Sequence, residues 1–248
     1  MGEIQSLARG LQILERIAES PQGVSITELA EVFGIDKGSV SRLLQTLAKY
    51  GFAEKVASTR RYVLGAQVVR LSRVMLARMP LRETARPFLT RLVEQTGECA
   101  HLAILAQGQA LYIDQQESPF SLRVTTGVGT MAPLFCTALG KVLLAFCYLP
   151  LPELKPYTAR TITDPLMLER HLEIVRAQGY AIDDEEYNVG VRCIAVPVYD
   201  DRASCVAAIG ISGPTSRLTL EKIPETAQAV VATGKELSAL LGFSEHAS

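Results

Sequence analysis

Residues 26–50, ITELAEVFGIDKGSVSRLLQTLAKY, constrain the fold most, because they fit two short amphipathic helices joined by a glycine turn. Leu29 and Phe33 lie on the apolar side of the first helix. Gly34 ends this helix, since glycine readily adopts the left-handed conformation of a helix C-cap. The second helix has apolar residues spaced three and four apart, which are Val40, Leu43, Leu44 and Leu47.

The other side of the second helix carries short hydrogen-bonding groups and two basic residues. These candidates for DNA contact are Lys37, Ser39, Ser41, Arg42, Gln45 and Thr46. A helix that buries one side and presents such groups on the other suits the DNA major groove, where hydrogen bonds read base edges. We therefore predict a helix-turn-helix with Ser39, Arg42 and Gln45 facing bases. The alternative is a helical hairpin that serves only as a packing unit.

Two short extended segments follow, residues 52–55 and 61–64, and they flank a polar tip. This pattern predicts a β-hairpin wing. Arg60 and Arg61 in the wing, together with Arg9 near the N-terminus, are candidates for contacts with phosphate or with the minor groove. Exposed arginines that only favour solubility are the alternative.

The charge distribution supports a nucleic-acid partner. The stretch from Lys37 to Arg73 has eight basic residues and one acidic residue, whereas the whole chain has a net charge of −1. Binding to the phosphate backbone requires clustered positive charge. Double-stranded DNA is therefore the predicted macromolecular partner.

A length of 248 residues allows one small and one larger domain. We predict a DNA-binding domain over residues 1–65, a linker helix over 66–80 and a second domain over 81–248. The linker has apolar residues at helical spacing and ends at Pro80.

Composition indicates a folded cytoplasmic protein. No stretch approaches the ~18 uninterrupted apolar residues of a transmembrane helix, and the N-terminus lacks the pattern of a signal peptide. The five cysteines show no close pairing in sequence, so we expect reduced and mostly buried thiols. We expect no membrane partner and no cofactor.

The C-terminal part mixes strands and helices without a repeated βαβ unit, which favours an α+β sheet covered by helices. The strands are expected at residues 99–105, 110–115, 122–125, 193–199 and 205–211. The helices are expected at residues 83–95, 137–148, 166–178 and 219–241.

Several stretches together resemble the IclR family of bacterial transcriptional regulators, and the resemblance covers nearly the full length. Residues 179–186, GYAIDDEE, and 190–200, GVRCIAVPVYD, fit the family signature of glycine, acid, glutamate, small residue and final aspartate at fixed spacing. Further similar stretches are residues 6–11, 28–30, 39–47, 62–65, 137–141 and 209–214.

The resemblance implies a winged helix-turn-helix, a linker helix and a GAF/profilin-like α/β effector domain. It also implies dimers, or dimers of dimers, on palindromic operators, with DNA affinity modulated by a small organic acid or aromatic metabolite. By position, the effector residues are Ala138, Leu139, Asp183, Cys193, Gly210 and Ser212. Some members have serine where this chain has Gly210, and the missing hydroxyl favours a larger or more apolar effector.

The C-terminal part offers two other candidate sites. The four acids from Asp183 to Glu186 suggest a metal site or acid/base pair, but adjacent side chains of a strand point to opposite faces. Cys193 with His101 as its base suggests a nucleophile, but no glycine elbow or oxyanion motif accompanies it. We expect no metal and no catalytic residue. An enzyme, or an oligomerisation module without ligand, is the alternative reading of this domain.

Overall fold

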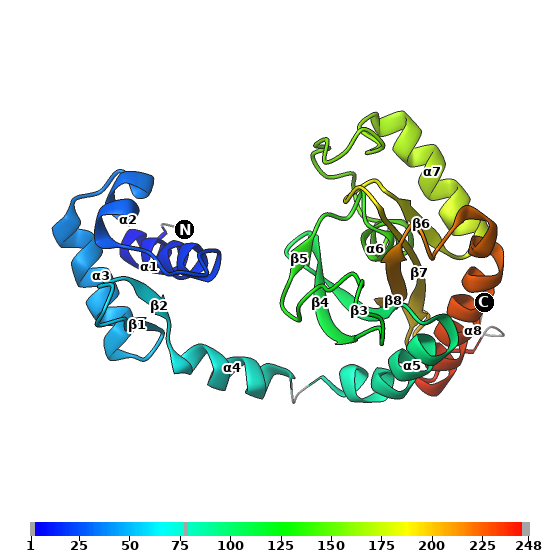
Figure 1. The fold of residues 1–248 in the computed structure, drawn as a ribbon, viewed down its shortest axis with the longest axis horizontal. Coiled ribbons are helices and arrows are strands. Elements are labelled where there is room, and N and C mark those ends of the chain that lie inside the picture. The colour runs from blue at the N-terminus through cyan, green and yellow to red at the C-terminus, as the bar shows by residue number, and fades with distance from the viewer. Residues whose placement is uncertain (1–2, 77–78, 245–248) are drawn as a thin grey trace. The chain divides into compact units, whose positions relative to one another are not determined.

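The computed structural model describes residues 3–76 and 79–244, and the chain divides into two compact units, Met1–Arg78 and Met79–Ser248 (Figure 1). The first unit contains α1 (Gln5–Ala18), α2 (Ile26–Phe33), α3 (Lys37–Lys49), β1 (Ala53–Lys55), β2 (Tyr62–Leu64) and α4 (Ala66–Leu76). This order confirms the predicted helix-turn-helix with a wing.

Helices α2 and α3 begin where a side chain accepts a hydrogen bond from one of the first backbone N–H groups of the helix. Ser25 Oγ accepts from the N–H of Glu28, and the N–H of Ser25 donates to Glu28 Oε2, which completes a capping box. Gly34 ends α2 with φ 62°, as predicted. Asp36 Oδ1 accepts from the N–H of Ser39 at 2.8 Å and so begins α3.

The wing is a two-stranded antiparallel hairpin in which Ala53 lies opposite Leu64. Tyr62 also pairs with Val24 through two backbone hydrogen bonds of 2.9 and 2.8 Å. This pairing joins the wing to the segment that precedes α2, so the wing is fixed to the helical core.

Helix α4 differs from the other helices of the first unit because none of its residues is buried. Its exposed apolar side chains are Val69, Leu71, Val74 and Met75. The predicted linker extends to residue 80, of which residues 77–78 lie outside the described part. Pro80 begins the next helix, α5 (Pro80–Thr96), which ends at Gly97 with φ 72°.

The second unit is built on one antiparallel sheet with the strand order β5-β4-β3-β8-β7-β6. Its strands are β3 (Cys99–Ala106), β4 (Gln109–Gln116), β5 (Met131–Ala132), β6 (Ala181–Asp184), β7 (Val191–Tyr199) and β8 (Cys205–Pro214). Its other helices are α6 (Ala138–Phe146), α7 (Pro165–Gln178), a 3-10 turn (Leu220–Lys222) and α8 (Ile223–Leu240).

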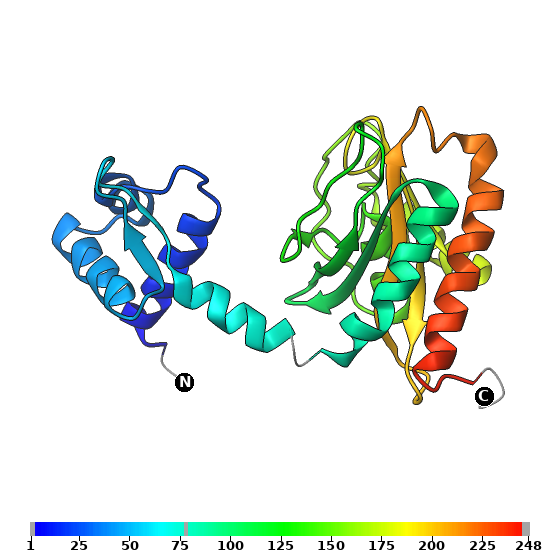
Figure 2. The same ribbon diagram turned by 60° about the horizontal axis from the view of Figure 1, so that its bottom comes forward.

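Helices cover both faces of this sheet, which confirms the predicted α+β class (Figures 1 and 2). Helices α5 and α8 lie side by side on one face, over a core that includes Ile194, Val196 and Val198. Helix α6 covers the other face, where Ala195 and Ala208 are buried, and α7 packs on α6. The alternation of Ile194, Ala195 and Val196 is the two-residue period of a strand.

The strand predicted at residues 122–125 is wrong. This segment has no ladder partner, and Leu122 is 66% exposed. Its carbonyl oxygen instead accepts from Arg217 Nη1 at 2.8 Å. The edge of the sheet is completed by Met131 and Ala132, which pair with β4. The local sequence alone predicted a strand here, but no neighbouring strand supplies its hydrogen bonds.

A glycine in α6 provides a test of how closely this helix approaches the preceding loop. A Cβ at Gly140 would lie 2.5 Å from the Pro133 carbonyl oxygen and 2.6 Å from Leu134 Cα. Alanine normally stabilises a helix more than glycine does. Because the added Cβ has no room here, we predict instead that Gly140→Ala lowers the free energy of unfolding by about 1–3 kcal/mol. Urea unfolding measures this change. The control is Gly127→Ala, whose Cβ meets nothing closer than Thr130 Oγ1 at 3.8 Å; equal stability of the two variants would contradict the prediction.

Candidate nucleic-acid interface and effector site

The outward side of α3 is accessible along its length. Lys37, Arg42, Gln45 and Thr46 are exposed, while Ser39 and Ser41 are half-buried. The opposite side is fixed in the core by Val40 and Leu44, both 0% exposed. Four of the six predicted DNA contacts of α3 are therefore exposed, and the two serines are half-buried.

Hydrogen bonds along the helix surface hold several of these side chains. Arg42 Nη2 donates to Ser39 Oγ at 3.1 Å, and Gln45 Nε2 donates to Ser41 Oγ at 3.4 Å. Thr46 Oγ1 donates to the Arg42 carbonyl oxygen at 2.9 Å. All three bonds are exposed to solvent, so exchanging them for bonds to a nucleic acid costs little free energy.

Arg9 of α1 lies beside this surface. Together with Arg42 it borders a hollow of about 390 Å³ between α1 and α3. The other lining residues are Gln5, Ser6, Ser39, Leu43 and Thr46. This hollow has two guanidinium groups and no acidic side chain in its lining, which is the charge pattern that phosphate binding requires.

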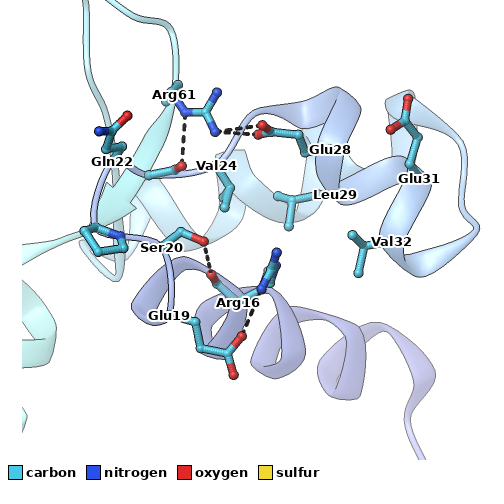
Figure 3. A pocket seen from close by; sticks show the side chains of 12 residues that line it. Arg16, Glu19, Ser20, Gln22, Val24, Glu28, Leu29, Glu31, Val32 and Arg61 are labelled. Atoms are coloured by element: carbon cyan, nitrogen blue, oxygen red, sulfur yellow. Dashed lines mark hydrogen bonds and ion pairs between the residues drawn. The ribbon is translucent and has the colours of Figure 1, made fainter.

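The two wing arginines have different environments. Arg60 is exposed at the tip of the hairpin and has φ 58°. Arg61 instead donates to both carboxylate oxygens of Glu28, at 2.8 and 2.7 Å, and to the carbonyl oxygen of Gly23 at 3.0 Å (Figure 3). Hydrogen bonds from Arg61 and from Ser25 lower the pKa of Glu28 to about 2. Arg61 thus connects the wing to α2, and its contact with phosphate or the minor groove stays a prediction.

A second hollow of the first unit, about 590 Å³, adjoins this ion pair and is shown in Figure 3. Its charged lining combines Arg16 and Arg61 with three glutamates, Glu19, Glu28 and Glu31. Arg16 also pairs with Glu19, at 3.1 Å. Because its carboxylates outnumber its guanidinium groups, this hollow lacks the charge pattern of a phosphate site.

In the second unit, the predicted effector residues lie on the face of the sheet covered by α6. Asp183, Cys193 and Ser212 form a row across β6, β7 and β8, because Asp183 pairs with Cys193 and Cys193 pairs with Ser212. Ala138 and Leu139 begin α6, where the first N–H groups have no partner within the helix. Thr137 Oγ1 caps this end by accepting from the N–H of Gly140 at 3.1 Å.

The acidic run from Asp183 to Glu186 does not stay in one strand. Strand β6 ends at Asp184, and Glu185 has φ 63°, so the chain turns back. The N–H of Glu186 consequently donates to Asp183 Oδ1 at 2.8 Å. Strand alternation therefore does not hold as far as Glu186. Asp184 pairs instead with Arg160 and Arg192, so the four acidic side chains do not converge on one site. Burial raises the pKa of Asp183 to about 7.

A buried ammonium group balances these carboxyl groups. Lys141 of α6 is 0% exposed, and its Nζ forms an ion pair with Glu186 Oε1. The same Nζ lies 3.1 Å from His171 Nε2 of α7. Burial, with a smaller effect of Lys141, lowers the pKa of His171 to about 4. Our sequence interpretation missed this cluster, although a lysine inside the apolar run of residues 137–148 was a visible signal.

His101 binds Ser212 rather than Cys193. His101 Nε2 and Ser212 Oγ are 2.6 Å apart, and burial lowers the pKa of His101 to about 4, so its ring is neutral at neutral pH. Burial also raises the pKa of Cys193 well above its ordinary value. A thiolate nucleophile activated by His101 is therefore not formed. Tyr112, which no local pattern indicated, is also buried, and burial, with smaller effects of Cys193 and Asp183, raises its pKa.

Close packing of the backbone, rather than a ligand, explains the glycine at position 210. It pairs with Ala195 and His101 on the neighbouring strands. A Cβ at this position would lie 2.3 Å from the Ile194 carbonyl oxygen and 2.8 Å from Ala195 Cα. The close approach of β7 and β8 therefore accounts for glycine here, and the missing hydroxyl alone says little about the size of an effector.

Two further features bear on the class of protein. Within residues 3–76 and 79–244, no three His, Cys, Asp or Glu side chains gather as a metal site. His246 lies outside these residues. Every helix in the same ranges is too short or too polar to cross a lipid bilayer.

Both units of the chain match known protein families. A family model described as bacterial transcriptional regulator IclR C-terminal matches residues 73–239, and the IclR helix-turn-helix domain matches residues 6–57. The acetate operon repressor of Salmonella typhimurium is 35% identical over 250 residues, which cover 97% of this chain and 91% of that protein. The transcriptional regulator BhcR of Paracoccus denitrificans is 38% identical over 245 residues, covering 96% and 87%.

Solved structures show the same architecture. The crystal structure of the Thermotoga maritima IclR has a TM-score of 0.76 and 33% identity, and the match covers 97% of this chain and 100% of that one. An IclR transcriptional regulator from Alicyclobacillus acidocaldarius has a TM-score of 0.80 and 26% identity, with 97% and 100% covered. The named relatives are transcriptional regulators, not enzymes.

The raised pKa of Asp183 predicts a pH-dependent stability. In the folded state the pKa of Asp183 is about 7, whereas the ordinary pKa of an aspartate is 3.8. The unfolded chain therefore loses this proton first as the pH rises, and the free energy of unfolding falls between pH 3.8 and about pH 7. Asp183→Asn should remove this loss. Urea unfolding between pH 4.5 and pH 8 should show the variant gaining stability relative to the wild type as the pH rises. The control is Asp201→Asn in an exposed turn; a pH-independent difference for Asp183→Asn would refute the prediction.

Proposed function

Because the chain belongs to the IclR family of bacterial transcriptional regulators, we propose that it binds palindromic operator DNA and that a small organic acid or aromatic metabolite modulates this binding. The observation that carries the proposal is the cationic hollow between α1 and α3, where Arg9 and Arg42 border the exposed side of the recognition helix. The protein acts in the cytoplasm, where it meets its operator.

In this proposal α3 enters the major groove. Ser39, Arg42 and Gln45 face base edges, and arginine in particular recognises guanine by two hydrogen bonds. The groups that hold the DNA backbone, or the adjacent minor groove, are Lys37, Ser41, Thr46, Arg9 and Arg60. Arg61 supports them by holding the wing against Glu28.

The chain acts as a homodimer or as a dimer of dimers. Exposed apolar side chains support this assembly: Leu7 and Leu11 lie one turn apart on the same face of α1, and α4 exposes Val69 and Val74. A soluble protein gains free energy by covering such apolar faces. A dimer places two recognition helices in successive major grooves, with half-sites ~34 Å apart or a multiple of that distance.

The effector binds on the α6 face of the second unit. The start of α6, at Ala138 and Leu139, favours an anionic group such as a carboxylate, because N–H groups and the helix dipole point there. Asp183, Cys193 and Ser212 offer polar atoms across the sheet. Glu186 Oε2 and His101 Nδ1 are buried without a hydrogen-bond partner in the described part of the chain. Burying a polar atom without a hydrogen bond costs free energy, and a polar ligand that binds these atoms removes this cost.

The effector changes DNA affinity only if it favours one arrangement of the two units over another. Helix α4 precedes the boundary between the units, and no residue of it is buried. It is therefore the segment through which we expect a change in the effector unit to reach the DNA-binding unit.

Removing the base-reading guanidinium tests the proposal. Arg42→Ala should weaken operator binding by ~1–3 kcal/mol, because a bidentate contact to a base is lost. The effect should depend on the operator sequence. Fluorescence anisotropy with labelled operator and scrambled duplexes, at one fixed salt concentration, measures it.

The matched control is Arg16→Ala, which removes the same charge from α1 but from the hollow that contains Glu19 and Glu31. This variant should keep operator affinity. Calorimetry with an effector should give equal affinities for Arg42→Ala and the wild type. Unchanged operator affinity and sequence preference in Arg42→Ala would remove this residue from the reading face.

A further inference from the structure

Two cysteines that are far apart in sequence meet at one end of the second unit. Cys147 follows the last residue of α6 and caps it, whereas Cys205 is the first residue of β8. Cys147 Sγ lies 3.4 Å from the Cys205 carbonyl oxygen, across 58 positions of sequence. Cys205 Sγ lies 3.5 Å from the Ala207 carbonyl oxygen on the same strand. Both thiols thus lie over the first residues of β8.

The surroundings of this pair differ from those of the other cysteines. Cys99 and Cys136 are buried, with 2% and 0% exposure, and Cys193, although half-buried, lies within the proposed effector site without a second cysteine assigned to it. Cys147 and Cys205 are only half-buried. A small oxidant can therefore reach a thiol that already has a second thiol beside it.

The closeness of the two residues makes their thiols unequal. The Cys205 side chain lowers the pKa of Cys147 to about 7, and the same contact, with burial, raises the pKa of Cys205. Cys147 consequently loses its proton more readily than Cys205 does. The thiolate is the form of cysteine that reacts as a nucleophile.

We propose that Cys147 and Cys205 form a reversible disulfide on exposure to a peroxide. The Cys147 thiolate attacks one peroxide oxygen and breaks the O–O bond, which gives a sulfenic acid and releases hydroxide. The Cys205 sulfur then attacks the Cys147 sulfur, its proton leaves with the sulfenic oxygen as water, and the S–S bond forms. The hydroxide takes up the proton that Cys147 lost, so that two thiols are oxidised and one hydrogen peroxide is reduced to two waters. A dithiol reductant reverses the reaction by thiol–disulfide exchange.

The position of the bond suggests what it regulates. It ties the C-terminal end of α6 to the start of β8. The other end of α6 carries Ala138 and Leu139, and β8 carries Ser212, so the bond restrains two of the elements that form the proposed effector site. This consequence rests on the proposed function, whereas formation of the disulfide does not.

The test uses the full reduced chain, treated with hydrogen peroxide, alkylated and digested with trypsin without reduction. Mass spectrometry should find one linked species that joins residues 142–160 to residues 203–217, lighter than the two peptides by two hydrogen atoms. Dithiothreitol should restore the separate peptides. The oxidised chain should also unfold at a higher temperature, because a cross-link reduces the entropy of the unfolded state.

Cys147→Ser and Cys205→Ser should each abolish the linked species and the rise in melting temperature, while Cys99→Ser should retain both. A link between other cysteines, or oxidised Cys147 without a link to Cys205, would overturn the proposal. Operator binding measured on the same reduced samples reports separately on the proposed function, because a chain that forms the disulfide but ignores DNA contradicts only the latter.

Discussion

The rotation of α3 about its axis is the constraint on which the DNA-binding surface depends. Val40 and Leu44 are completely buried against the helices of the first unit, and this leaves one rotation in which the helix packs. The polar side must then face solvent, with Arg42 next to Arg9 of α1. Asp36 fixes where the helix begins, and the pairing of Tyr62 with Val24 fixes the wing. Surface chemistry therefore follows from core packing.

In the second unit, a buried charge holds together the segments that surround the proposed effector site. Lys141 on α6 meets Glu186 after β6 and His171 on α7, so one ammonium group connects three segments that are distant in sequence. Removing one partner of a buried ion pair leaves an uncompensated charge, which is costly. This cluster adjoins Asp183 and so sets the electrostatic environment in which we propose that the effector binds.

The sequence was sufficient where local rules decide the structure. Apolar spacing located α2 and α3, and glycine chemistry located the turn at Gly34. It was insufficient where distant segments meet. No local pattern could show that Arg61 pairs with Glu28, that Glu186 turns back to Asp183, or that Cys147 meets Cys205. The false strand at residues 122–125 has the same origin, because a strand needs a partner that its own sequence does not specify.

The most direct test of the central claim is a selection of duplexes from a random DNA library with the full chain, followed by titration of the selected duplex at two salt concentrations. The account predicts an inverted repeat with half-sites ~34 Å apart or a multiple of that distance, and an affinity that falls as salt rises. Recovery of no common sequence, together with no binding to any duplex at low salt, would contradict it.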